Sequence, residues 1–91
     1  MMTLDRLPVG SSGVITKVGG EGELRIRLLD MGLIPRTLVK TYKIAPLGDP
    51  IEIHLRGYSL TLRKEDASNI EIEESDRDAD EAAAHRGEMI G

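Results

Sequence analysis

The sequence contains no cysteine, tryptophan or phenylalanine, and two tyrosines are its only large aromatic residues. Without cysteine the chain has no disulfides, no thiolate metal ligands and no thiol nucleophile. With so few rings it lacks the stacking platform typical of proteins that bind single-stranded nucleic acid. No apolar run approaches the roughly 20 residues of a membrane-spanning helix, and no basic region followed by an apolar run begins the chain. We therefore expect a cytoplasmic protein whose core is held by packing alone.

The net charge of −4 is unevenly distributed. Residues 1–72 contain ten Lys or Arg against nine Asp or Glu, whereas residues 73–91 contain two against seven. A neutral first part argues against a dedicated nucleic-acid-binding protein, which normally has a clustered basic face. The second part has few aliphatic side chains and cannot bury a core. We therefore predict one domain over residues 1–72 and an acidic disordered tail over residues 73–91.

Five segments are predicted to be short strands. They are rich in β-branched residues or alternate between apolar and polar side chains, and turn residues bound them. They are Ser11–Val18, Arg36–Ala45, Ile51–Arg56, Tyr58–Arg63 and Ile70–Ile72. The third and fourth form a hairpin with a tight turn around Arg56-Gly57. Lys64–Asn69 is short enough for one helical turn. Short strands with strong turns predict a mostly β fold, and a barrel would protect the strand edges.

One segment, Glu21–Met31, has the period of a helix. Leu24, Leu28 and Met31 follow at spacings of four and three, while the arginines between them can face water. Gly32 stands where a left-handed C-terminal cap is favoured, and Pro35 prevents continuation. The sequence thus predicts a single short helix inserted after the first predicted strand.

The polar residues suggest no catalytic centre. No carboxylates pair on an apolar strand face, and no serine lies in a G-x-S-x-G turn, so we predict that the chain is not an enzyme. His54 shares its strand parity with Glu52, which favours an outward-facing residue over a metal ligand. Asp76, Asp78 and Asp80 have the spacing of the start of a calcium loop, but the required glycine and final glutamate are missing.

Two apolar segments stand next to glycine and proline, Leu28–Pro35 and Pro46–Pro50. The first holds more apolar side chains than one helix stripe can bury. Two interpretations remain open. Either the loop after Gly32 folds back and buries all of these side chains, or some stay exposed as a contact patch for a partner.

The order of these segments resembles the ferrous iron transport protein A family, also called the FeoA domain. The resemblance runs from Leu4 to Ile72, and only Met31 and Arg36 depart from it, standing where the family often has Leu and Gly. The segments that carry it are Leu4–Leu7 with Gly10, Gly13–Ile15 with Val18–Gly20, Arg27–Pro35, Pro46–Ile51, Leu55–Gly57, Leu60–Arg63, and Ala67 before Ile70.

The resemblance implies an SH3-like barrel without a cofactor that assists bacterial ferrous iron uptake. It would do so as a protein-binding module that docks on the cytosolic GTP-binding part or the pore region of the ferrous iron permease, reaching the membrane only through that partner. A weak homodimer through an open barrel edge is an additional possibility. We predict that the contact surface consists of Leu29, Met31, Leu33, Pro46, Leu47 and Gly48.

Two other hypotheses remain. The first is a transition-metal-binding sensor that holds Fe(II) or Zn(II) through His54, Glu52 and nearby carboxylates, although such ligands without thiolate would bind weakly in an open strand. The second is a small RNA-binding barrel, which the neutral charge and scarce aromatic residues oppose.

Overall fold

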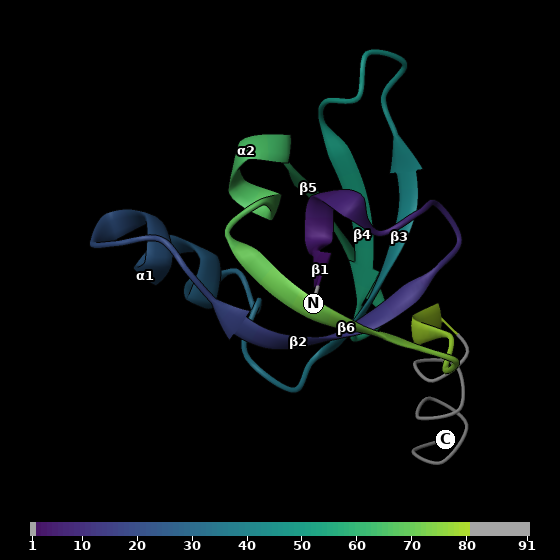
Figure 1. The fold of residues 1–91 in the computed structure, drawn as a ribbon, viewed down its shortest axis with the longest axis horizontal. Helices are drawn as coiled ribbons and strands as arrows, with labels where there is room; N and C mark the ends of the chain where they lie inside the picture. Colours follow the sequence, from purple (N-terminus) through teal and green to yellow (C-terminus); the bar gives the residue numbers. More distant parts are fainter. Residues whose placement is uncertain (1, 81–91) are drawn as a thin grey trace.

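The computed structural model describes residues 2–80, which form one antiparallel sheet with short helices around it (Figure 1). The strands are β1 (Met2–Thr3), β2 (Ser12–Val18), β3 (Leu38–Ile44), β4 (Ile51–Leu55), β5 (Tyr58–Leu62) and β6 (Ile70–Ser75). The helices are the 3-10 helix η1 (Leu4–Arg6) and the α-helices α1 (Glu23–Asp30) and α2 (Lys64–Ala67). The strand order is β1-β6-β2-β3-β4-β5. The predicted SH3-like barrel is confirmed, and it is open because β1 and β5 lie at opposite ends of that order.

All five predicted strands are present, but the sequence did not reveal β1. This strand has two residues and is defined only by its partners, because Met2 lies opposite Ile72 and Thr3 opposite Glu71 in β6. Two residues carry no detectable period, so only the pairing with a distant segment creates the strand. The fold therefore has six strands instead of five, and α1 follows the second of them.

The β4–β5 hairpin forms one wall of the core, as its alternating pattern predicts. Ile51, Ile53 and Leu55 are buried on β4 while the residues between them are partly exposed. On β5 the burial decreases toward the turn, so that Leu62 is buried but Tyr58 is exposed. The ring of Tyr58 is therefore available outside the core.

The core lies inside the curled sheet and is closed at one side by η1 and α2. Leu4, the first residue of η1, and Leu7, the residue after it, are fully buried, and η1 packs against α2 and β6. Burying one such side chain contributes about 1.5–3 kcal/mol. Within residues 2–80, the buried residues of this core cluster are Leu4, Leu7, Ile15, Val18, Leu28, Leu33, Val39, Ile51, Ile53, Leu55, Leu62, Ala67, Ile70 and Ile72.

The ordered chain continues beyond the boundary predicted at residue 72. β6 extends to Ser75 because it pairs with β2, where Ser12 lies opposite Ser75. Ala79 is then buried against the barrel. Disorder from residue 73 onward is therefore wrong for residues 73–80, and residues 81–91 lie outside the described part of the chain. Within the described residues, no helix is long and apolar enough to cross a bilayer.

Candidate docking surface

The chain reverses direction directly after α1. Gly32 has a φ of +94°, its N–H donates to the Leu29 carbonyl at 3.0 Å, and the N–H of Leu33 donates to the Leu28 carbonyl at 3.1 Å. This pair of bonds is the Schellman motif, which usually brings apolar residues on either side of the cap into contact. The left-handed cap predicted at Gly32 is confirmed, and it returns Leu33 to the core.

This reversal decides which apolar residues of Leu28–Pro35 remain accessible. Leu28 and Leu33 are both fully buried, whereas Leu29 and Met31 are partly buried and Ile34 is 38% exposed. The interpretation that all of these side chains are buried is wrong, because they divide between the core and the surface, and the part of the alternative that leaves some of them exposed is confirmed. Leu33 as a contact residue is wrong, since a side chain with no exposed area cannot touch a partner.

The β4–β5 turn holds the loop after α1 in place. The Tyr58 hydroxyl donates to the Met31 carbonyl at 3.0 Å, and Arg56 Nη2 donates to Thr37 Oγ1 at 3.0 Å. The Tyr58 hydroxyl lies so close to Gly32 that a Cβ there would collide with it. Arg36 has a φ of +75°, a conformation that costs a non-glycine residue roughly 1–2 kcal/mol.

The β3–β4 loop has the opposite character. The Gly48 N–H donates to the Ala45 carbonyl at 2.7 Å, and the Ala45 N–H donates to the Pro50 carbonyl at 3.0 Å. Asp49 Oδ1 accepts the N–H of Lys64, the first residue of α2, at 2.9 Å. The loop is thus tied across its base and to a neighbouring helix, while Leu47 at its tip is 97% exposed.

The predicted contact residues do not form one surface. α1 and the loop between β3 and β4 lie at separate sides of the barrel (Figure 1). Of the predicted residues, Pro46 and Leu47 are exposed at the loop, whereas Leu29 and Met31 are only partly accessible beside α1. A further accessible apolar residue that was not predicted is Ile26, which is 59% exposed on α1. It lies off the Leu24–Leu28 stripe of a helical wheel, so that signal was available.

The proposed metal ligands are near each other but do not converge on a point. His54 Nδ1 lies 2.9 Å from Asp80 Oδ1, and its Nε2 lies 3.4 Å from Glu52 Oε2, so the two carboxylates approach opposite edges of the imidazole. The Tyr42 ring stacks on the same imidazole, with centroids 4.1 Å apart. Residues 2–80 contain no group of three or more His, Asp or Glu side chains that could hold a metal ion.

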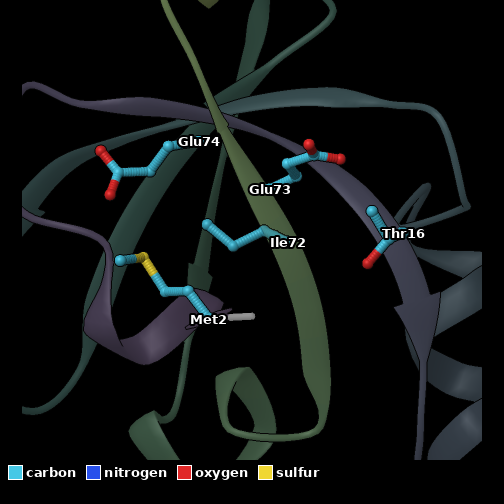
Figure 2. A pocket seen from close by; sticks show the side chains of 5 residues that line it. All are labelled: Met2, Thr16, Ile72, Glu73 and Glu74. Carbon is cyan, nitrogen blue, oxygen red and sulfur yellow. The ribbon is translucent and has the colours of Figure 1, made fainter.

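A shallow pocket between β1, β2 and β6 also lacks convergent chemistry. Figure 2 shows its lining residues Met2, Thr16, Ile72, Glu73 and Glu74, and the carboxylates of the two glutamates point apart. Adjacent residues of a strand face opposite sides, so this arrangement follows from the backbone. These carboxylates cannot act as a general acid and base on one substrate atom.

Comparison with known proteins places these features in a family. A 39% identical segment of 72 residues occurs in the Fe(2+) transport protein A/Fe(2+) transporter FeoB fusion protein of Porphyromonas gingivalis, covering 79% of this chain but 8% of that protein. The solution structure of iron(II) transport protein A from Clostridium thermocellum has a TM-score of 0.77 and 38% identity, covering 80% of this chain and 45% of that one.

A more distant structure supports the fold alone. The zinc complex of FeoA from Stenotrophomonas maltophilia, described as a procaryotic SH3 domain protein, has a TM-score of 0.71 at 23% identity and covers 80% of this chain and 91% of that one. A model of the FeoA domain family matches residues 2–74, which include every strand except the last residue of β6. The chain therefore belongs to the FeoA domain family.

Proposed function

We propose that this chain is a cytoplasmic accessory module of bacterial ferrous iron uptake that docks on the cytosolic part of the ferrous iron permease through the β3–β4 loop. Support comes from the Porphyromonas gingivalis relative, in which an FeoA domain and the transporter FeoB are parts of one protein. Covalent linkage of this kind keeps two modules at high effective concentration, which suits domains that work in contact.

The observation that carries the proposal is the full exposure of Leu47 on a loop that is otherwise tied down. An exposed leucine contributes about 1.5–3 kcal/mol when a partner buries it. A loop already held by Asp49 and by its own backbone bonds loses little conformational entropy on binding, so more of that energy remains as affinity. A protruding apolar tip fits a small hydrophobic pocket on the partner.

The test is binding of tagged protein to membranes that contain the permease, and to the separately purified cytosolic GTP-binding part of that permease. We expect Leu47→Asp to reduce binding at least tenfold, because a carboxylate would have to be desolvated in the pocket. Val9→Asp is the matched control, since Val9 is also an exposed apolar residue, with 56% of its area accessible.

Each outcome of this binding test has a distinct interpretation. Loss of binding in Leu47→Asp alone supports docking through the β3–β4 loop, and retention on the purified GTP-binding part would assign the contact to that region. Equal binding of Leu47→Asp and the wild type would exclude this loop as the docking surface. Circular dichroism of all three proteins checks that each is folded.

A further inference from the structure

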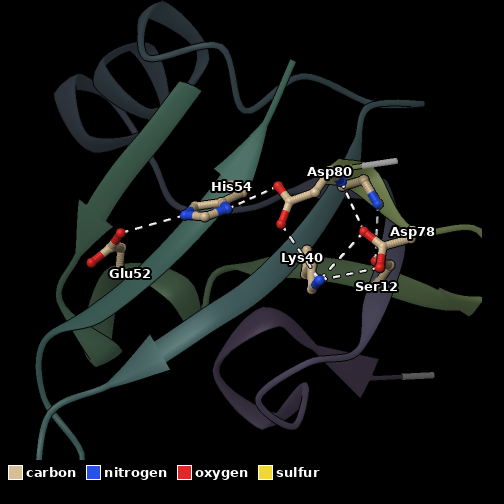
Figure 3. A network of polar contacts seen from close by, with 7 residues as sticks. Ser12, Lys40, Glu52, His54, Asp78 and Asp80 are labelled. Atoms are coloured by element: carbon tan, nitrogen blue, oxygen red, sulfur yellow. Dashed lines mark hydrogen bonds and ion pairs between the residues drawn. The ribbon is translucent and has the colours of Figure 1, made fainter. Parts of the chain in front are cut away.

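A second face of the barrel already holds an acidic segment of the chain itself. It lies at the end of the β3–β4 hairpin opposite Leu47, where Lys40 of β3 pairs with His54 of β4, and Ser12 of β2 lies opposite Lys40 on the other side. Residues 78–80 rest on this face (Figure 3). We call Ser12, Lys40, Tyr42 and His54 the acid-binding face.

Each polar group of this face contacts the segment in a different way. Lys40 Nζ lies 3.1 Å from Asp78 Oδ2 and 3.5 Å from Asp80 Oδ2, so one ammonium group bridges both carboxylates. His54 Nδ1 lies 2.9 Å from Asp80 Oδ1. Between the two acidic residues, the N–H of Ala79 donates to Ser12 Oγ at 3.3 Å.

The face selects for a pattern of residues as well as for charge. Ala79 is only 5% exposed, so the position between the two carboxylates is covered and holds a small side chain in this chain. The Asp80 N–H donates to Asp78 Oδ1 at 2.9 Å, which holds the two acidic residues in a turn that matches Lys40. The complementary ligand is therefore Asp-small residue-Asp.

The sheet is also shaped around this face. The pairing of β3 with β4 shifts register between Thr41 and Lys43, so Tyr42 is the extra residue of a β-bulge. The bulge presents the Tyr42 ring to the imidazole of His54, and the stack fixes the imidazole orientation toward Asp80.

Hydrogen bonding to Asp78 raises the pKa of Lys40 above its ordinary value, and the nearby acidic charges act in the same direction, so Lys40 stays positively charged at physiological pH.

Residues 78–80 are held on the acid-binding face by contacts that another ligand can readily replace. The side chains of Asp78 and Asp80 are 38% and 44% exposed, and ion pairs to carboxylates this accessible to solvent are screened by water and salt and stabilise a contact only weakly. The FeoA match ends at residue 74, so residues 78–80 are an extension of this chain laid over the family domain. The acid-binding face is specific in its geometry, but residues 78–80 bind it only weakly. Another acidic ligand can therefore displace them.

We propose that the acid-binding face docks an acidic Asp-small residue-Asp segment of a partner protein, and that residues 78–80 occupy it in cis as a competitor. This goes beyond the function proposed above, because it uses a different face and does not require the permease. Competition from within the chain would set a threshold on partner binding, since a tethered segment acts at about millimolar effective concentration.

The test uses the full chain and a fluorescent peptide with the sequence of residues 75–80 as the probe. Asp78→Asn with Asp80→Asn empties the face, and we expect this double variant to bind the peptide at least tenfold more tightly than the wild type does. Glu73→Gln with Glu74→Gln is the matched control, because it removes the same charge at exposed positions of β6. Adding Lys40→Met to the first variant should reduce peptide affinity at least tenfold.

Three results would overturn the proposal: equal affinity of the wild type and the double Asn variant, absence of binding to that variant at millimolar peptide, or tight binding that survives Lys40→Met. A peptide with Asn in place of both aspartates should not bind.

Amide NMR shifts of the wild type provide a second measurement, because raising the salt concentration should move the Ser12 and Ala79 signals toward those of the double Asn variant. Unchanged signals would contradict an exchangeable cis contact.

Discussion

The loop after α1 and the loop between β3 and β4 look alike in sequence but behave oppositely in the structure. Each places a leucine near a glycine and a proline, yet Leu33 has no exposed area while Leu47 is 97% exposed. The difference lies in which residues the backbone hydrogen bonds of each loop connect. The Schellman motif directs Leu33 back to the helix it follows, whereas the β3–β4 loop is tied across its base and to α2, so its tip points away. Apolar composition alone therefore does not identify a docking residue.

The largest expected effect comes from truncating the buried leucine. Leu33→Ala should lower the free energy of unfolding by about 2–5 kcal/mol, because it removes a filled core position and leaves a cavity. Urea unfolding followed by circular dichroism measures the loss. Ile26→Ala is the control, since Ile26 is exposed on α1 and its truncation should change stability by less than about 0.5 kcal/mol. A similar loss in both variants would contradict the division between core and surface.

The two loop glycines sharpen the comparison. Both have positive φ, +94° at Gly32 and +88° at Gly48, so alanine at either position costs roughly 1–2 kcal/mol of backbone strain. Only Gly32→Ala also displaces the Tyr58 hydroxyl from the Met31 carbonyl, a further loss of about 0.5–1.5 kcal/mol, whereas no atom of the described residues lies within 4 Å of a Cβ at Gly48. Urea unfolding should rank Gly32→Ala as the more destabilised. The opposite ranking would show that Tyr58 does not lock this loop.

The smallest expected effect concerns the tie that holds the β3–β4 loop. Asp49→Ala removes the acceptor for the Lys64 N–H at the start of α2 and should cost about 1 kcal/mol, as capping residues do. Asp49→Asn keeps an oxygen acceptor and should retain most of the stability. Hydrogen exchange at the Lys64 amide measures the change directly. Equal exchange in Asp49→Ala and the wild type would mean that the carboxylate does not support the loop.

Much of the fold follows from local patterns. The alternation of Ile51, Ile53 and Leu55 predicted β4, and Gly32 with Pro35 predicted the end of α1 to within one residue. These features depend on side chains a few residues apart, which the sequence displays directly. The candidate docking surface was harder to predict from the sequence. Leu47 was correctly placed in a turn, but its exposure, the burial of Leu33 and the separation of the two apolar segments depend on contacts across the barrel.

The part played by residues 73–80 shows the limit of composition as a guide. Their acidity and scarcity of aliphatic residues predicted disorder. In the structure, however, β6 continues because β2 offers unpaired backbone groups, and the acidic residues beyond it meet Lys40 and His54. Charge and small size are unfavourable for forming a core, but they are favourable for docking onto a complementary surface that distant strands assemble.

The sequence by itself determined the family, the mostly β class, the hairpin and the capped helix, because each is encoded by residue types at short spacing. The tertiary structure alone decided that β1 exists, which leucines are buried, and that Asp78 and Asp80 lie against Lys40. The physical reason is range. The two-residue strand β1 and the contact of Lys40 with Asp78 each depend on a partner 38 or more residues away. The exposure of Leu47 depends on which other parts of the barrel fail to cover it. No pattern of neighbouring residues encodes either condition.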